Sequence, residues 1–291
     1  MPVYDAIVLA IVQGLTELLP VSSSAHVIIA AKLLHQDMST PANALLLVML
    51  HAGTMFAVIV YFWRQWINTF FSSWQAFLRF APLAVVACLL SGAVYIPLNL
   101  LIVHILGGGT RRAETEELFN KLNWIAPALA AAGILILYAG LQEAGHLAPS
   151  PVRGKKGFGW RQAVVMGIVQ GFAIPFRGFS RSGSTISAGL LAEGGRLPVE
   201  SFSFALAVAI TPPAIVLEIN RWHRAQIQAG AHIHLAAALV PNLLGLGCAF
   251  AAGLLALKWL SGWLEQGRWY LFGIYCLLAA AAAELLYLRG W

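Results

Sequence analysis

The sequence contains several apolar stretches that are each long enough to cross a bilayer. They lie at about 42–63, 80–106, 122–141, 201–218, 235–260 and 269–287. About 20 helical residues cross a hydrocarbon core of about 30 Å, and only helices or closed barrels satisfy their backbone polar groups within lipid. The alternation typical of a barrel strand is absent. These stretches therefore predict an all-α, polytopic integral membrane protein with about six full transmembrane helices.

The composition agrees with a membrane protein. Hydrophobic residues make up 59% of the chain and charged residues only 10%, with a mean hydropathy of +0.77, whereas about a quarter of the residues in soluble proteins are charged. The net charge of +6 comes from basic residues in short connections between the apolar stretches. Because they do not form one basic face, we expect the bilayer as a partner and no nucleic acid. The N-terminus lacks the pattern of a cleaved signal peptide, so we expect the first segment to remain.

A row of polar groups interrupts the first apolar helix between residues 11 and 26. Gln13 and Glu17 are four residues apart and share one face of a helix. Pro20 disfavours helix at the residue before it. The hydroxyls of residues 22–24 are suited to cap a second helix over about 25–34.

Neither part of this broken element crosses a membrane alone. At 1.5 Å per residue, a helix over 4–19 is about 24 Å long and one over 25–34 is about 15 Å. Irregular backbone at membrane depth is tolerated only where it is buried in protein or lines a cavity. We therefore expect a re-entrant element.

The same pattern returns 157 residues later. The four residues 11–14 match 168–171 letter for letter, and the serine-rich break recurs over 177–185. This duplication predicts a second broken element and an inverted repeat within one membrane domain, 1–291. Its copies are approximately 4–141 and 161–288, and the linker is 143–160.

Four ionisable side chains are predicted at membrane depth in the two breaks: Glu17, His26, Arg177 and Arg181. Such residues are costly in a membrane and usually face a functional cavity. The helix that starts after each break directs free backbone N–H groups and a positive dipole end into it, and two such ends form an anion site. The planar fork of Arg181 suits phosphate oxygens, while Gly178 and Gly183 allow close approach of the backbone to a ligand.

These residues predict phosphate chemistry, with several roles left open. Ser23 or a neighbouring hydroxyl is placed to attack phosphorus, with His26 to exchange its proton. Alternatively, His26 itself is the nucleophile. Glu17 either binds a divalent cation or orients His26. The other ionisable residues of the spans are interpreted as span-end or packing groups: His51, Glu143, Glu193, Glu218 and Glu284.

Both motifs resemble those of the undecaprenyl pyrophosphate phosphatase family. The first appears as Gln13-Gly-Leu-Thr-Glu17 followed by Pro20-Val-Ser-Ser-Ser-Ala-His26, and the second as Arg177-Gly-Phe-Ser-Arg-Ser-Gly183. The resemblance covers essentially the whole chain. It implies a bacterial inner-membrane enzyme that hydrolyses undecaprenyl diphosphate to undecaprenyl phosphate and inorganic phosphate, which recycles the lipid carrier for cell-wall synthesis and is linked to bacitracin resistance.

The resemblance also implies roles for individual residues and a location for the site. The catalytic core is Glu17, Ser23, His26 and Arg181. The residues around the diphosphate are Gln13, Ser22, Ser24, Arg177, Gly178, Ser180, Ser182, Gly183 and Thr185. A divalent cation, Mg²⁺ or Ca²⁺, is expected at Glu17 and Gln13, and the site is expected towards the periplasmic side.

Two residues depart from the pattern of the family. Gln13 stands where many relatives have a second glutamate, which removes one negative charge from the expected cation site. Arg177 replaces the usual proline and adds a cation beside the expected phosphate site. Pro175 and Gly178 are then the residues expected to break the second helix.

Other functions fit part of the pattern. An inverted repeat with broken helices is also typical of a secondary transporter or lipid flippase, and a protein that only binds a lipid phosphate is a further alternative.

The connection at 64–79 and the linker at 143–161, if on one side, carry more basic residues than the opposite loops, which favours a cytoplasmic linker. The sequence leaves open whether the protein forms a homodimer.

Overall fold

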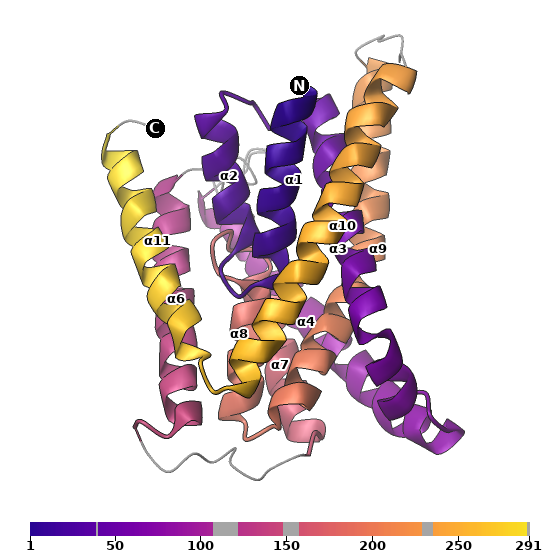
Figure 1. Ribbon diagram of the computed structural model, residues 1–291, viewed down its shortest axis with the longest axis vertical. Coiled ribbons are helices and arrows are strands. Elements are labelled where there is room, and N and C mark those ends of the chain that lie inside the picture. The colour runs from indigo at the N-terminus through magenta and orange to yellow at the C-terminus, as the bar shows by residue number, and fades with distance from the viewer. Residues whose placement is uncertain (39, 107–121, 148–156, 229–234, 290–291) are drawn as a thin grey trace.

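The computed structural model describes residues 1–38, 40–106, 122–147, 157–228 and 235–289, and within these ranges it contains helices and no strand (Figure 1). In chain order the helices are α1 (Val3–Leu18), α2 (Ser23–Leu33), α3 (Pro41–Thr69), α4 (Trp74–Leu106), α6 (Leu122–Ala144), α7 (Trp160–Ala173), α8 (Arg181–Leu191), α9 (Arg196–Gln228), α10 (Leu235–Glu265) and α11 (Tyr270–Leu288).

Among the described residues, six helices are long and apolar enough to cross a membrane: α3, α4, α6, α9, α10 and α11. The prediction of an all-α, polytopic membrane protein with about six spans is therefore confirmed. The helices extend beyond the predicted spans, because hydropathy marks the apolar part of a helix and not the end of its hydrogen bonding. For example, α9 begins at Arg196 and continues through Pro212 and Pro213 to Gln228.

The first polar break lies between α1 and α2, as predicted, but its serines are used differently. Ser22 is the N-cap residue of α2, yet its side chain makes no capping hydrogen bond, and Ser23 and Ser24 already belong to the helix. Ser22 has a left-handed backbone, with φ +67°. An N-cap side chain reaches the first turn from a β-region backbone, so the predicted capping role of the three serines is wrong.

The second break lies between α7 and α8. Helix α7 ends two residues before Pro175, and Gly178 has a left-handed φ of +102°, so both predicted helix breakers lie in the break. Helix α8 starts at Arg181, two residues before the expected start near Gly183. Here the cap forms, because the Ser180 hydroxyl accepts a hydrogen bond from the Gly183 N–H at 3.2 Å.

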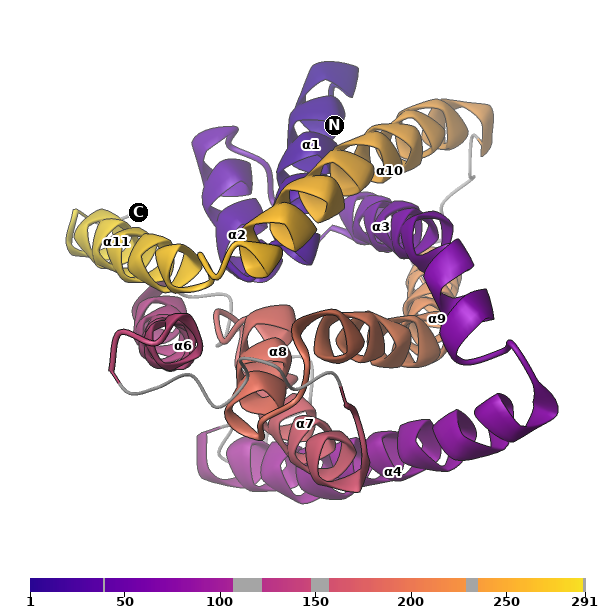
Figure 2. The ribbon, with the colours of Figure 1, turned by 60° about the horizontal axis from the view of Figure 1, so that its bottom comes forward.

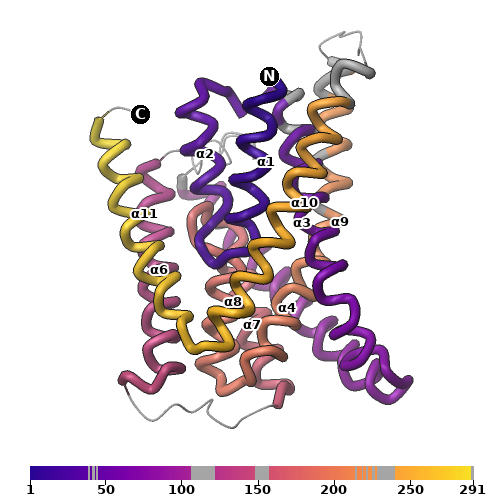
Figure 3. The backbone as a smooth tube through the Cα atoms, in the orientation of Figure 1, coloured from indigo at the N-terminus to yellow at the C-terminus, as the bar shows by residue number. Residues whose placement is uncertain are grey.

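The two broken elements enter the molecule from opposite ends. In Figure 1, α1 and α2 descend from the end that carries the N-terminus, while α7 and α8 rise from the end where α6 finishes. The backbone trace shows both breaks near the middle of the molecule (Figure 3). Viewed after rotation, α8 lies in the interior beside α6, α7 and α9 (Figure 2). This arrangement is what an inverted repeat requires.

Equivalent glycines bring each broken element against a spanning helix of the other half. A Cβ on Gly14 of α1 would lie 2.6 Å from the Ala249 carbonyl oxygen of α10, and one on Gly171 of α7 would lie 2.5 Å from the Ser91 carbonyl oxygen of α4. Gly14 and Gly171 are related by the repeat offset of 157. The close helix crossings, which require small residues, are therefore repeated along with the sequence.

The apolar surface and the connections agree with a spanning orientation. Many large apolar side chains on the outer helices are exposed, including Leu89 and Leu100 of α4 and Leu255 of α10, and lipid is their natural environment. The connection between α3 and α4 lies at the same end of the molecule as the facing ends of α6 and α7 (Figure 1). The described ends of the two predicted basic connections, 64–79 and 143–161, are thus on one side.

Candidate active site

Glu17, near the end of α1, receives polar contacts from its own helix and from three others. Its Oε2 accepts hydrogen bonds from Gln13 Nε2 at 3.0 Å and from Ser23 Oγ of α2 at 2.5 Å. Its Oε1 accepts one from Arg181 Nη2 of α8 at 3.2 Å. Nε2 of His51, on α3, lies 3.8 Å from Oε2. The carboxylate is therefore the point at which both motifs meet.

The Ser23 hydroxyl is paired with this carboxylate. A carboxylate only accepts hydrogen bonds, so Ser23 donates its proton towards Glu17. A hydroxyl that donates to an adjacent base is the arrangement of an activated nucleophile. The sequence interpretation gave the proton of the serine to His26, whereas the structure brings Ser23 to Glu17.

Arg181 is the first residue of α8 and so lies at the positive end of the helix dipole. Nη2 binds Glu17, while Nη1 is buried and has no hydrogen-bond partner among the described residues. A buried charged donor without a partner is costly. The free nitrogen and the dipole together favour an anion at this position.

His26 lies one turn into α2, with both ring nitrogens engaged away from Ser23. Nδ1 is 2.8 Å from the backbone carbonyl oxygen of Ser22, and Nε2 is 2.8 Å from the hydroxyl of Tyr275 on α11. His26 is therefore near the Glu17 cluster in the chain but bonded outside it. The sequence reasoning gave Tyr275 no role, because α11 lies far from both motifs in the sequence.

Hydrogen bonds and glycines hold the two breaks together. The Gly178 N–H donates to Ser24 Oγ at 3.3 Å, and Ser182 Oγ donates to the Leu19 carbonyl at 3.4 Å. Ser22 Oγ and Ser24 Oγ are 3.2 Å apart. A Cβ on Gly183 would lie 3.1 Å from Pro20 Cβ and closer still to α6. These residues, expected around the diphosphate, thus line the junction between the motifs.

Other residues of the second motif support the start of α8. Thr185 Oγ1 donates to the Arg181 carbonyl at 2.8 Å and lies 2.6 Å from Ser203 Oγ of α9. Ser180, Ser182 and Thr185 are buried, and Arg177 is half-buried in the break. Their contact with substrate stays a prediction, since their visible bonds hold the backbone that carries Arg181.

His51 was interpreted as a span-end or packing residue, and the structure places it beside Glu17. Its Nδ1 is 2.7 Å from the Leu47 carbonyl, so this nitrogen donates and Nε2 faces the carboxylate. Residues 17 and 51 are separated by a break, a short helix and a loop. The only local signal was a titratable group in an apolar span.

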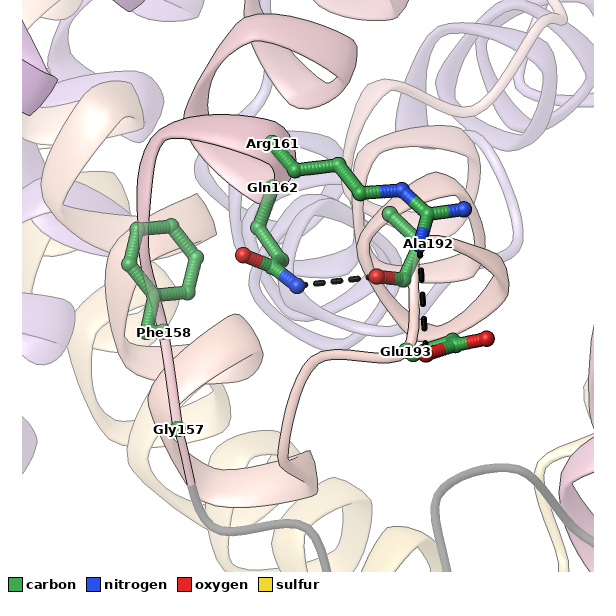
Figure 4. A pocket seen from close by; sticks show the side chains of 6 residues that line it. All are labelled: Gly157, Phe158, Arg161, Gln162, Ala192 and Glu193. Carbon is green, nitrogen blue, oxygen red and sulfur yellow. Dashed lines mark hydrogen bonds and ion pairs between the residues drawn. The ribbon is translucent and has the colours of Figure 1, made fainter.

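The hollow shown in Figure 4 is separate from this cluster. It encloses about 400 Å³ and lies at the opposite ends of α7 and α8 from the break. Gln162 Nε2 donates to the Ala192 carbonyl at 2.8 Å across it, and Arg161 lies 3.9 Å from Glu193. None of the predicted site residues lines it.

The donors at Glu17 fit a cation that is bound together with a phosphate. Glu17 and Gln13 place a carboxylate and an amide side by side, but the described residues contain no group of three or more His, Cys, Asp or Glu arranged to hold a metal ion. Mg²⁺ is commonly held by one or two carboxylates together with phosphate oxygens of the substrate. The Gln13 amide turns its nitrogen, and not its oxygen, towards Glu17, so Glu17 is the one oxygen ligand in place and the two side chains form part of a cation site and not a complete cage.

Comparison with known proteins identifies relatives over almost the full length. Residues 6–282 match the family described as Bacitracin resistance protein BacA. Undecaprenyl-diphosphatase 2 of Acinetobacter baylyi is 49% identical over 280 residues, 95% of each chain. The undecaprenyl-diphosphatase of Chlorobium phaeovibrioides is 30% identical over 100% of this chain and 99% of the relative, and that of Anaeromyxobacter sp. is 32% identical over 100% and 90%.

The match extends through both broken elements and all six spanning helices, so it includes every residue of the Glu17 cluster as well as Tyr275. The chain therefore belongs to the bacitracin resistance protein BacA family, whose named relatives are undecaprenyl-diphosphatases.

Proposed function

We propose that this protein is a membrane phosphatase that hydrolyses undecaprenyl diphosphate to undecaprenyl phosphate and inorganic phosphate, recycling the lipid carrier for cell-wall synthesis. Relatives named for this activity match along nearly the whole chain. The observation that carries the proposal is the Ser23 hydroxyl 2.5 Å from Glu17, with Arg181 on the other carboxylate oxygen.

In the first step Ser23 attacks the terminal phosphorus. Glu17 accepts the hydroxyl proton as the Ser23 Oγ–P bond forms, and the bond from phosphorus to the bridging oxygen breaks. Undecaprenyl phosphate leaves and phosphoserine remains. General base catalysis of this kind contributes about 10²–10⁴-fold in rate. The engagement of both nitrogens of His26 by Ser22 and Tyr275 favours Ser23 over His26 as the nucleophile.

In the second step water attacks the phosphoserine. His26 takes one proton of the water as the new O–P bond forms, the Ser23 Oγ–P bond breaks, and Ser23 recovers its proton from Glu17. His26 then passes its proton to the departing phosphate and returns to the neutral form. Inorganic phosphate leaves. His26 thus acts on water and product, while Glu17 serves the serine.

Arg181 binds the transferring phosphoryl group. Nη1 is directed to a phosphate oxygen while Nη2 keeps its bond to Glu17, and the N–H groups at the start of α8 add partial positive charge. Phosphoryl transfer depends chiefly on such positioning and charge stabilisation. The hydroxyls of Ser22 and Ser24 and the backbone at Gly178 complete the cradle.

A divalent cation, Mg²⁺ or Ca²⁺, is proposed to bind with the diphosphate at Glu17 and Gln13. It supplies charge neutralisation of the phosphate oxygens. The single carboxylate supports a cation that enters with the substrate, and Gln13 in place of a second acidic residue supports weaker cation binding than a two-carboxylate site would give.

The location proposed for the protein is the bacterial inner membrane, with the site towards the periplasm. Two observations support this. The described ends of the 64–79 and 143–161 segments are on one side of the molecule (Figure 1), and basic connections are typical of the cytoplasmic side. The first broken element, which carries Glu17 and Ser23, enters from the opposite end (Figure 1).

The test is phosphate release from undecaprenyl diphosphate by the purified protein in detergent, with and without Mg²⁺ or Ca²⁺. Wild type should release phosphate in a cation-dependent manner, and Ser23→Ala should abolish release while retaining binding of the lipid. A phosphoryl-enzyme trapped during turnover should be stable in acid, as phosphoserine is and phosphohistidine is not. Retained turnover in Ser23→Ala would exclude Ser23 as the nucleophile, and no release from wild type would favour transport or binding instead.

A further inference from the structure

His26 has a fixed tautomer in the ground state. Its Nδ1 lies 2.8 Å from the Ser22 carbonyl oxygen, which can only accept, so Nδ1 carries the proton. The lone pair of the neutral ring is then on Nε2. Any proton that His26 gains or loses in the reaction passes through Nε2.

Tyr275 controls this nitrogen. Its hydroxyl lies 2.8 Å from His26 Nε2 and, because that nitrogen is the acceptor, Tyr275 donates. The two rings are also stacked, with centroids 5.6 Å apart and planes at 14°. Hydroxyl and ring together restrict both the position and the rotation of the imidazole.

The contact joins separate parts of the fold. Tyr275 is on α11, which packs mainly on α6, and it is 249 residues from His26 in the chain. Its side chain is large and amphipathic, yet the residue is 46% exposed. Its hydroxyl therefore finds a hydrogen-bond partner on α2, across from its own helix.

We propose that Tyr275 is a positioning residue for the phosphatase reaction: at rest its hydroxyl holds His26 in the Nδ1–H tautomer with Nε2 in a fixed orientation, and it releases Nε2 to the attacking water during hydrolysis of the phosphoenzyme. Tyr275 acts through His26 and not on the lipid. This inference rests on the proposed function.

The main test is a double-mutant cycle with Tyr275→Phe, which removes one oxygen and keeps the ring. We expect kcat for undecaprenyl diphosphate to fall about tenfold, the upper range for loss of one neutral hydrogen bond, with KM within about twofold. In the His26→Ala background the same change should alter kcat less than about twofold, because contacts that act through one group are not additive. Tyr287→Phe, on the same helix and 43% exposed, is the matched control and should behave as wild type.

A second measurement does not depend on turnover. Diethyl pyrocarbonate modifies an unprotonated imidazole nitrogen that is accessible, and mass spectrometry of the peptide containing His26 gives the rate. Since the Tyr275 hydroxyl covers Nε2, Tyr275→Phe should accelerate modification of His26 severalfold, whereas Tyr287→Phe should not. This measurement decides the matter if His26→Ala is too slow to assay.

The outcomes separate this inference from the proposed function. If wild type releases phosphate and Tyr275→Phe does so at the wild-type rate, with unchanged modification of His26, the role of Tyr275 is refuted and the phosphatase stands. An equal loss of kcat in both backgrounds would refute it as well, since the effect would then be structural. If wild type releases no phosphate, the function itself fails.

Discussion

Of the two terminal nitrogens of the Arg181 guanidinium, only one is bonded to the protein among the described residues. Nη2 binds Glu17 and Nη1 is buried without a partner among the residues described, so a phosphate oxygen is the expected ligand. We predict that Arg181→Ala lowers kcat/KM for undecaprenyl diphosphate by about 10²–10³-fold. Arg181→Lys should recover only part of this, because an ammonium group cannot bridge carboxylate and phosphate in one plane.

Steady-state phosphate release measures both variants of Arg181. Arg161→Ala is the matched control, since this arginine is 66% exposed and lies at the far end of α7 beside Glu193. It should retain wild-type kinetics. Full activity in Arg181→Ala, or full rescue by lysine, would contradict the assigned role.

His51 is predicted to hold Glu17 in the orientation that accepts the proton of Ser23. With Nδ1 anchored on the Leu47 carbonyl, Nε2 lies 3.8 Å from the carboxylate. We expect His51→Ala to lower kcat about tenfold. That factor corresponds to about 1.4 kcal/mol.

The kinetic assay used for Arg181 also tests His51. His146→Ala is the control, because His146 follows α6 and contacts Tyr270 at the start of α11, and it should leave kcat unchanged. An unchanged kcat in His51→Ala would return His51 to the packing role that the sequence suggested.

At the scale of single elements, the crossing of α1 over α10 depends on Gly14. An added Cβ would meet the carbonyl oxygen and side chain of α10 at 2.6 Å, and such contacts cannot relax without moving a helix. We predict that Gly14→Ala destabilises the protein by about 1–3 kcal/mol and also lowers kcat, because Glu17 is one turn further along α1. Thermal unfolding in detergent and phosphate release measure the two effects.

Two other glycines provide controls for that substitution. Gly171→Ala makes the equivalent clash in the other half, against Ser91, and should destabilise the protein with a smaller loss of kcat, since no equivalent of Glu17 follows it. Position 174 is Ile. Gly247→Ala, on α10, where an added Cβ has nothing within 4 Å, should leave kcat unchanged and should not destabilise the protein. Equal stability of Gly14→Ala and Gly247→Ala would contradict the argument.

The breaks show what local sequence can and cannot predict. Pro20 and Pro175 restrict the backbone wherever they occur, and Gly178 permits the left-handed φ that its break uses. The breaks lie where these residues predicted them. The hydrogen-bond partner of Ser23 could not be predicted in this way. Its capping role depended on the backbone at Ser22, which is left-handed, and its actual partner, Glu17, is presented by tertiary packing.

At the scale of the whole molecule, the spans and the duplicated pattern could be predicted from the sequence. A helix that crosses lipid must have a certain length and a high hydropathy, and both are visible in the sequence. The four members proposed as the catalytic core were identified through their motifs. His51 and Tyr275 were not, since α3 and α11 carry no local pattern that relates them to the breaks. A residue that contacts a site from another element can be identified from the folded structure, because the sequence around it does not show that contact.

The halves are also joined at the end of the molecule away from the N-terminus. Arg196, at the start of α9, binds Glu143 of α6 through Nε and Nη2 and donates from Nη1 to the Glu265 carbonyl of α10 at 2.6 Å. The Glu143 side chain is only 1% exposed. Removing one partner of a buried pair leaves a charge without compensation, which typically costs about 3–5 kcal/mol.

We therefore predict that Arg196→Ala lowers the free energy of unfolding by about 3–5 kcal/mol, measured by denaturant or thermal unfolding in detergent. The double variant Arg196→Met with Glu143→Gln should recover most of that loss, because it removes both charges and keeps the volume. Arg161→Ala, in an exposed pair with Glu193, should stay within about 0.5 kcal/mol of wild type. Helix α6 ends and α9 begins at the end of the molecule away from the N-terminus, whereas α1 ends near the middle (Figure 1), so kcat per folded molecule should be unchanged in all three variants. A double variant as unstable as Arg196→Ala would mean that packing, and not the buried charge, holds this end together.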